Sequence, residues 1–255
     1  MQKKKIIITA PEIYGNKLKT VLSKYNFNVI QFPTIETVLS DNSEFKTLFS
    51  EILTFDYIIL PSRNAINSFI KQAKKYHITN KTLQSLKYVT IGKDTELLRN
   101  FNLHPELKIK EASTKGIFEA LKKINHIKKL AVITPKVKII NEPDIIPDFI
   151  KMLQSLAKVY RIDGYITQPV LNYEQKTHKI ISQSNYDLIA FTSGAETEAL
   201  QYILKDDTIF SNLKVACFGP YTASSAVKIG LNPKIIGRNF NSFEGFAEVI
   251  IRYFG

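Results

Sequence analysis

Four short turns carry most of the candidate chemistry in this sequence. Each turn ends an apolar run that predicts a strand and precedes a pattern that predicts a helix. Backbone N–H groups at such a helix opening lack partners within the helix and suit an anion such as a carboxylate or phosphate. The hydroxyl groups of the turns could instead serve only as helix caps. The turns are Pro61-Ser62-Arg63-Asn64, Gly92-Lys93-Asp94-Thr95, Thr192-Ser193-Gly194-Ala195 and Gly219-Pro220-Tyr221-Thr222.

Other catalytic patterns are scarce. The sequence contains no HExxH, CxxC, GxSxG or paired-carboxylate motif, and its four histidines lack the spacing of metal ligands. We therefore expect neither a metal nor a cofactor. One further residue, Tyr160 in the segment VYRID, could donate a proton to a ligand or hydrogen bond it. Burial of Tyr160 in the core is the alternative interpretation.

The charge of the chain favours an anionic ligand over a nucleic acid. The formal net charge is +12, yet only five of the 35 basic residues are arginine, and the lysines are scattered. Proteins that read bases rely on arginine, and no nucleic-acid-binding motif occurs. The charge is therefore typical either of solvated helix faces or of a field that attracts an anion.

The sequence also predicts a cytoplasmic protein. No apolar run approaches the roughly 20 residues of a membrane span. The apolar part of the N-terminal MQKKKIIITAP is too short for a signal peptide. The single cysteine, Cys217 in the segment VACFG, excludes an internal disulfide and fits a reducing compartment. We expect a buried, inert thiol there.

Three pairs of similar segments occur in the same order in two parts of the chain. Such a repeat, with strands alternating with helices, predicts two similar α/β domains with parallel sheets and a cleft between them. The pairs are DYIILPSRNAINSFI with DLIAFTSGAETEAL, YVTIGKDTELLRNFNLHPEL with VACFGPYTASSAVKIGLNPKI, and STKGIFEAL with SFEGFAEVI. The predicted strands are Lys5–Thr9, Val29–Phe32, Tyr57–Leu60, Tyr88–Ile91, Leu130–Thr134, Lys158–Arg161, Leu188–Phe191, Val215–Phe218 and Lys234–Ile236. Helices are predicted between them, for instance at Gly15–Tyr25, Ala65–Tyr76, Ile145–Ser155 and Ala195–Leu204.

The second copy of the repeat is incomplete at its end. The first copy continues into a strand–helix–strand unit, and the matching unit of the second copy is found at the N-terminus. We therefore expect one discontinuous domain, residues 1–33 plus 168–255, and one inserted domain, residues 36–158. The connectors at 33–37 and 159–167 would form a hinge, which places Tyr160 beside the cleft.

The order of these motifs resembles the uroporphyrinogen-III synthase family over essentially the whole chain. The resemblance rests on ILPSRNAINSF, VTIGKDTELLRNFNL, VYRID, FTSGAETEAL and FGPYTASSAVKIGL. It implies two doubly wound, flavodoxin-like domains joined by a two-stranded connector. It also implies a cofactor-free, cytoplasmic hydro-lyase of porphyrin and heme biosynthesis. The substrate would be hydroxymethylbilane, a linear tetrapyrrole with eight carboxylates, which loses water and closes to uroporphyrinogen III with ring D inverted.

The resemblance also suggests roles for individual residues. Tyr160 matches the connector tyrosine that is thought to act as a general acid. Backbone amides at helix openings would hold most of the substrate, between the domains. The expected substrate-binding residues are Ser62, Arg63, Asn64, Gly92, Thr95, Thr192, Ser193, Gly194, Gly219, Tyr221 and Thr222.

Several residues depart from the family pattern and leave an alternative open. Pro61 replaces a threonine, Glu96 replaces an alanine, Tyr221 adds bulk beside Thr222, and the segment after Thr134 lacks an Arg-Gly pair. The alternative is a non-catalytic two-domain protein that binds a tetrapyrrole or another polyanion. For either function we expect a monomer without nucleic-acid or membrane partners. A transient contact with the preceding enzyme of the pathway is a further expectation.

Overall fold

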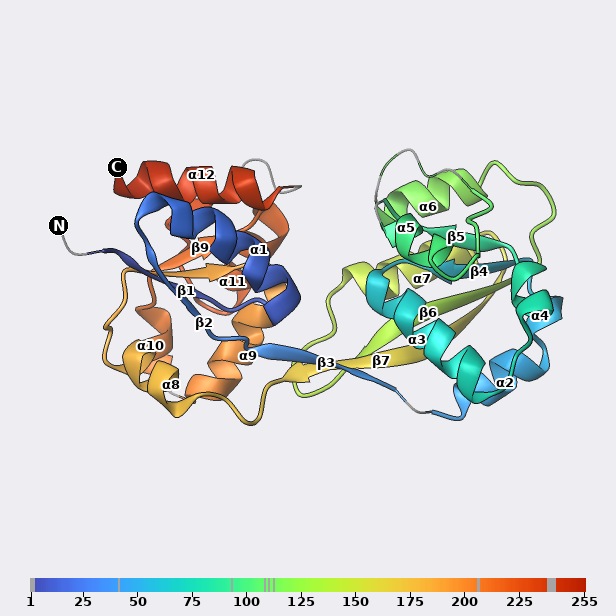
Figure 1. Cartoon of the computed structure of the whole chain (residues 1–255), viewed down its shortest axis with the longest axis horizontal. Coiled ribbons are helices and arrows are strands. Elements are labelled where there is room, and N and C mark those ends of the chain that lie inside the picture. Colours follow the sequence, from blue (N-terminus) through green and yellow to red (C-terminus); the bar gives the residue numbers. More distant parts are fainter. Residues whose placement is uncertain are drawn as a thin grey trace. The chain divides into compact units, whose positions relative to one another are not determined.

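The chain divides into two compact units in a computed structural model. Unit 1 comprises Met1–Glu36, Lys138–Asn141 and Gln168–Gly255, and unit 2 comprises Thr37–Val137 and Glu142–Thr167 (Figure 1). The structure describes residues 3–40, 42–92, 94–107, 109, 111, 113–205, 207–237 and 242–255. The peptide therefore crosses the boundary between the units four times, because a short piece after Val137 belongs to unit 1.

Unit 1 is built on a parallel sheet of five strands. Its order is β10-β9-β8-β1-β2. The N-terminal strand β1 pairs in parallel with β8, with Ile6 opposite Leu188, as the position of the missing repeat unit predicts. The strands are β1 (Lys5–Ile8), β2 (Asn28–Gln31), β8 (Leu188–Phe191), β9 (Val215–Cys217) and β10 (Ile235–Ile236).

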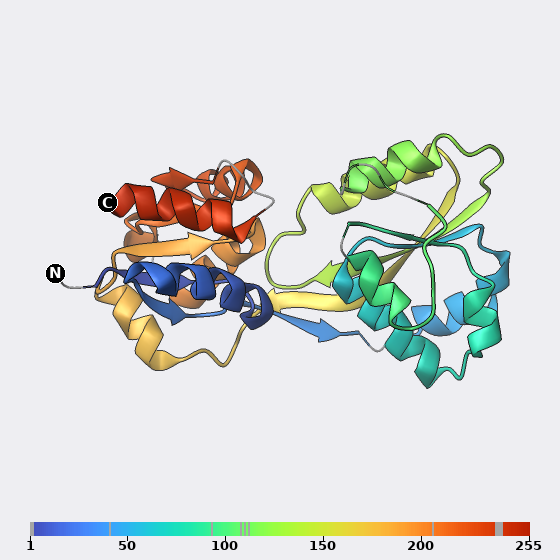
Figure 2. The same cartoon turned by 45° about the horizontal axis from the view of Figure 1, so that its top comes forward.

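Helices cover both faces of the unit 1 sheet (Figures 1 and 2). α1 (Glu12–Leu22) and α12 (Phe243–Phe254) pack on the face that carries Ile6 and Ile8. The other face carries Ile7 and Phe191 and is covered by α8 (Gln175–Ser182), α9 (Gly194–Leu204), α10 (Asp207–Ser211) and α11 (Pro220–Lys228). A short 3-10 helix, Ser23–Tyr25, extends α1. The apolar runs of the sequence thus become strands that are buried on both faces.

Unit 2 repeats four strands of this order and has a different fifth strand, β3, at one edge. Its sheet has the order β3-β7-β6-β4-β5. If β6 and β7 are equated with β1 and β2, the order β7-β6-β4-β5 equals β2-β1-β8-β9 of unit 1. The neighbouring pairs among these four strands are parallel. The strands are β3 (Ile35–Leu39), β4 (Tyr57–Leu60), β5 (Tyr88–Thr90), β6 (Lys129–Val137) and β7 (Lys158–Pro169).

The helices of unit 2 also lie on both faces of its sheet. One face packs against α2 (Glu44–Ser50), α3 (Arg63–Lys75), α4 (Asn80–Gln84) and α5 (Asp94–Arg99), with Phe69 among its fully buried side chains. The other face packs against α6 (Thr114–Leu121) and α7 (Ile145–Gln154). A 3-10 helix, Ile52–Thr54, leads into β4. Within the described part of the chain, no helix combines the length and the apolar character that crossing a membrane requires.

Two strands differ most from the sequence prediction. The predicted strand Lys158–Arg161 continues to Pro169, and the segment Ile35–Leu39, expected to be part of a connector, forms β3 beside it. The longer β7 is possible because β6 also extends, to Val137, and supplies partners as far as Thr167. The register shifts between Thr134 and Pro135, so that Gly164 is an extra residue on β7. This β-bulge is important for the site described below.

Candidate active site

All four predicted turns lie at the carboxyl ends of parallel strands. Two of them follow β4 and β5 in unit 2, and two follow β8 and β9 in unit 1. In each unit the two strands are neighbours, so that both turns of a unit lie at the same edge of its sheet. Ligands of open parallel sheets bind at this edge, next to the openings of the following helices.

The turn after β4 is held by the hydroxyl of Ser62. Ser62 caps α3, and its Oγ accepts a hydrogen bond from the Ala65 N–H at 3.2 Å. The same Oγ lies 3.0 Å from the hydroxyl of Tyr165 on β7. Arg63 and Asn64 form the first turn of α3. Ser62 is therefore a helix cap, as one interpretation predicted, and its cap bond uses the third amide of the helix.

The turn after β5 is linked to the turn after β4 by an ion pair. The Arg63 guanidinium lies 3.5 Å from the Asp94 carboxylate at the start of α5, and both side chains are partly exposed. The Thr95 and Thr90 hydroxyls are 2.8 Å apart. Gly92 has a φ of 53°, a left-handed conformation that glycine adopts readily. Lys93, the second residue of this predicted turn, lies outside the described residues.

Tyr165 reaches the Ser62 turn because of the bulge at Gly164. Along a regular strand, Tyr165 would share a face with Arg161 and Asp163. The extra residue moves Tyr165 to the face of Ile162, where both side chains belong to one buried cluster. Ser68 on α3 secures the bulge, since its hydroxyl donates to the Gly164 carbonyl.

Tyr160 lies at the opposite end of the strand. It is opposite Ala131, near the amino ends of β6 and β7. Its ring is in edge contact with Phe55, and the ammonium of Lys129 lies 4.8 Å from the ring centre. A hydrogen bond from Lys158 to Tyr160 raises the pKa of that lysine. Within unit 2, the structure thus brings Tyr165, and not Tyr160, to the Ser62 turn.

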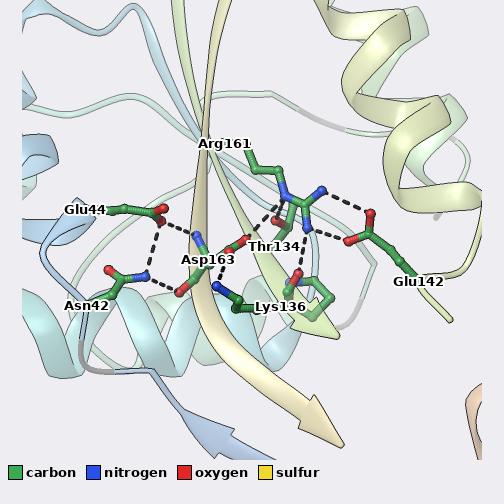
Figure 3. Close-up of polar contacts among 8 residues, drawn as sticks. Asn42, Glu44, Thr134, Lys136, Glu142, Arg161 and Asp163 are labelled. Carbon is green, nitrogen blue, oxygen red and sulfur yellow. Dashed lines mark hydrogen bonds and ion pairs between the residues drawn. The ribbon is translucent and has the colours of Figure 1, made fainter. Parts of the chain in front are cut away.

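An ionic network occupies the region beyond Thr134, where the family pattern has an Arg-Gly pair (Figure 3). The Arg161 guanidinium binds both oxygens of Glu142, at 2.5 and 3.2 Å, and donates to the Pro135 carbonyl at 3.0 Å. Asp163 lies 3.4 Å from the same guanidinium. The hydrogen bond to Glu142 raises the pKa of Arg161, which therefore stays charged. The network fixes the strand ends and leaves this arginine engaged by protein groups.

The turn after β8 in unit 1 is organised around Glu196. This carboxylate accepts hydrogen bonds from the Thr192 N–H at 2.8 Å, the Thr192 hydroxyl at 2.5 Å and the Ser193 hydroxyl at 3.0 Å. The Thr9 hydroxyl at the end of β1 donates to it at 2.7 Å. Ser193 is the N-cap residue of α9 but makes no side-chain cap bond to the backbone. Thr192 and Ser193 are therefore brought together, with their hydroxyls directed at a buried carboxylate.

Burial dominates the electrostatics around Glu196. Its side chain is 1% exposed, and the loss of solvation raises its pKa. Burial likewise raises the pKa of the Cys217 thiol to about 12, and the Glu196 charge adds to this shift. Cys217 is fully buried and unreactive at neutral pH, as predicted from its strand.

The turn after β9 packs against the turn after β8. The buried Thr222 donates to the Thr192 carbonyl at 3.4 Å. A Cβ on Gly194 would lie closer than 3.0 Å to both Oγ and Cβ of Ser225 on α11, so this position requires glycine. Gly219 is the N-cap residue of α11 in extended backbone, and Tyr221 is 82% exposed.

Sequence reasoning missed three residues that hold these turns: Thr9, Tyr165 and Glu196. The Ser193-to-Glu196 spacing is that of a capping box, so Glu196 had a recognisable signal. Tyr165 had none, because a bulge cannot be located by counting alternate residues. Among the described residues, no group of three His, Cys, Asp or Glu side chains could hold a metal ion.

Comparison with known proteins identifies the family of this chain. A model of the family "Uroporphyrinogen-III synthase HemD" matches residues 16–244. The chain belongs to this family. It is 25% identical over 230 residues to the porphyrin biosynthesis protein HemD of Ruminiclostridium josui, with 89% of this chain and 44% of that relative covered. The chain therefore spans less than half the length of this relative.

Solved structures of the same family share the fold. A mutant uroporphyrinogen III synthase from Thermus thermophilus superposes with a TM-score of 0.65 at 14% identity, covering 98% of each chain. Uroporphyrinogen-III synthetase from Helicobacter pylori superposes with a TM-score of 0.60 at 14% identity, covering 98% of this chain and 99% of that one. The mixed α/β fold with parallel sheets is thus the fold of these enzymes.

Proposed function

We propose that this protein is a uroporphyrinogen-III synthase. It converts hydroxymethylbilane to uroporphyrinogen III with loss of water and inversion of ring D, which makes it a hydro-lyase of porphyrin biosynthesis. The family match over residues 16–244 carries the proposal. The whole-chain resemblance in motif order agrees with it.

The turns offer groups that suit this substrate. Hydroxymethylbilane carries eight carboxylates, and helix openings with cationic neighbours bind carboxylates well. The turn after β4 provides such an opening beside the partly exposed Arg63. The formal net charge of +12 adds a field that attracts a polyanion. We propose contacts to the substrate without a metal or cofactor, from Ser62, Arg63, Asn64, Gly92, Thr95, Thr192, Ser193, Gly194, Gly219, Tyr221 and Thr222.

The proposal includes finer features of the architecture and setting. We infer that the two units correspond to two flavodoxin-like, doubly wound domains and that β3 and β7 form the two-stranded connector. The strand order 2-1-3-4-5 of unit 1, counted along its chain, supports this inference. A monomer in the cytoplasm completes the proposal, and the free, buried Cys217 fits that compartment.

Two phenols are candidates for the proton donor that assists loss of the hydroxyl group. The resemblance in VYRID favours Tyr160. The geometry of unit 2 favours Tyr165, because its hydroxyl lies 3.0 Å from Ser62 Oγ at the edge where ligands of parallel sheets bind. A general acid must reach the group that it protonates. We therefore propose Tyr165 for this role. Tyr160 is the alternative, and mutation of each tyrosine can distinguish the two.

The decisive experiment is an isomer assay. Freshly prepared hydroxymethylbilane is added to the purified protein, the products are oxidised to porphyrins, and the isomers are separated chromatographically. We expect the type III isomer. If only the spontaneous type I isomer forms while the protein still binds a tetrapyrrole, the chain is a non-catalytic binding protein and the proposed function is wrong.

A further inference from the structure

Glu196 differs from its counterpart in the other copy of the repeat. Aligning the turns at Ser62 and Ser193 places Glu196 opposite Ala65. The Ala65 amide donates to Ser62, so the hydroxyl of the first serine accepts a hydrogen bond from the backbone of the helix that it caps. The second serine makes no such bond and donates to the carboxylate instead. The hydrogen bonds of the serine hydroxyl therefore run in opposite directions in the two turns.

Burial raises the pKa of Glu196, but the hydrogen bonds that it accepts from Thr192, Thr9 and Ser193 oppose this shift and favour the ionised carboxylate. Such a group accepts only and has about four acceptor positions. Thr192 and Ser193 supply two hydroxyl donors, and the Thr192 amide supplies a third. The Thr9 hydroxyl is 2.7 Å from the carboxylate and also 3.1 Å from the Ala190 carbonyl, so its one hydrogen is shared between them. In the part of the chain that the structure describes, no lysine or arginine makes an ion pair with Glu196. Among the described residues, hydroxyl and amide hydrogens are thus the groups that stabilise its charge.

This arrangement changes what the turn can offer a ligand. A serine or threonine hydroxyl has a single hydrogen. Since Thr192 and Ser193 give theirs to Glu196, the half-buried oxygens present lone pairs on their other sides. These oxygens accept hydrogen bonds but cannot donate one to a carboxylate. A negative charge directly beneath the turn also repels a carboxylate.

A tetrapyrrole carries groups that suit such a surface. Besides its carboxylates, each pyrrole ring has an N–H that needs an acceptor. We propose that Glu196 makes the turn after β8 an acceptor site for pyrrole N–H groups of the substrate, and not a donor site for its carboxylates. This inference rests on the proposed function, and it revises the role that the sequence suggested for Thr192 and Ser193. Glu196 acts through these two residues and is therefore a positioning residue.

Two kinetic constants should move in opposite directions when Glu196 is replaced. In E196Q the amide nitrogen is a donor, so the hydroxyls turn to accept from it and direct their hydrogens outward. We expect KM for hydroxymethylbilane to rise about tenfold because N–H acceptors are lost, a change equivalent to about 1.4 kcal/mol. We expect the inhibition constant of tricarballylate, a tricarboxylate without N–H groups, to fall about tenfold. General loosening of the fold would raise both constants.

Matched variants guard against a folding artefact. E196A installs the residue that α3 carries at the equivalent position, so the helix opening tolerates it, and the same opposite shifts are expected. E248Q makes the same change of charge at an exposed residue of α12 and should leave both constants within about twofold of wild type. If both constants rise in E196Q and E196A, Glu196 shapes a carboxylate site and the inference is wrong. If neither constant changes, Glu196 has no part in recognition and the inference is also wrong.

A binding measurement separates this inference from the proposed function. Absence of the type III isomer with wild-type protein would refute the proposed function alone. Calorimetric titration with tricarballylate then still compares wild type with E196Q without turnover. Tighter binding by E196Q is the required result. Equal, weaker or undetectable binding by E196Q overturns the acceptor assignment.

Discussion

The bulge at Gly164 predicts that the substitution Gly164→Ala lowers the stability of the protein. A Cβ at this position would lie closer than 3.0 Å to Cγ2 of Ile133 and 3.1 Å from Oγ of Ser68. Both neighbours are fully buried, so neither side chain has free space to move into. Gly164 lacks the left-handed φ found at Gly92 and Gly230, so alanine meets no backbone strain. The cost must therefore come from packing.

The magnitude follows from two opposing contributions. Carbon atoms pack best about 3.5–4.0 Å apart, so the new methyl forces Ile133 or the strand to shift. Overpacking of this kind costs about 1–3 kcal/mol. The loss of glycine's freedom in the unfolded chain returns about 0.4–1 kcal/mol. We expect the free energy of unfolding of Gly164→Ala to fall by about 1–2 kcal/mol.

Urea unfolding followed by far-ultraviolet circular dichroism measures this cost, since the chain has no tryptophan to report by fluorescence. The Ile133→Ala background is the matched control because it removes the clashing Cγ2. In that background Gly164→Ala should cost nothing or stabilise by about 0.4–1 kcal/mol. An equal loss of stability in the wild-type and Ile133→Ala backgrounds would refute the packing argument. So would a Gly164→Ala protein that is as stable as wild type.

Two further predictions concern the proton donor and the dependence of stability on pH. Tyr165→Phe removes the hydroxyl beside Ser62 and should lower kcat about 100-fold, within the range of general acid catalysis, while Tyr160→Phe should stay near wild type. The reverse order in the isomer assay would return the role to Tyr160. Asp187 accepts from the Lys5 N–H at 2.8 Å and from the Lys4 ammonium at 2.9 Å. Partial burial disfavours its charge, but these two donors outweigh burial and lower its pKa. Because the pKa of Asp187 is lower in the folded chain than in the unfolded chain, its ionised form stabilises the protein at pH values above the unfolded pKa. Asp187→Asn should therefore cost about 0.5–1 kcal/mol of stability at pH 7. The difference should shrink below about pH 4 in parallel thermal melts, and a constant difference down to about pH 2 would contradict the assignment.

Much of the fold was predictable because the strands are buried on both faces. Runs such as YIIL and LIAF have no polar face, and Tyr57–Leu60 and Leu188–Phe191 are strands with those bounds. The order of the repeats predicted that β1 joins the sheet of β8. The segment Ile35–Leu39 was not recognised as a strand because only Ile35 in it is buried. An edge strand of this kind is stabilised by its partner β7, a pairing that local sequence does not encode.

The site was less predictable, and for a different reason. Hydroxyl residues at helix openings are visible in a sequence, so Ser62, Thr95, Ser193 and Thr222 were located. Their partners depend on tertiary placement. Thr9 is distant in sequence from Glu196, and their contact exists only because β1 pairs with β8. Tyr165 reaches Ser62 only because one extra residue shifts the register of β7.

The two copies of the repeat differ at positions on which ligand recognition should depend. At two aligned positions of the turns, Arg63 is opposite Gly194 and Ala65 is opposite Glu196. The first turn therefore carries a partly exposed arginine that is paired with Asp94, and the second carries a buried carboxylate. Carboxylates bind better at the former, and N–H donors bind better at the latter.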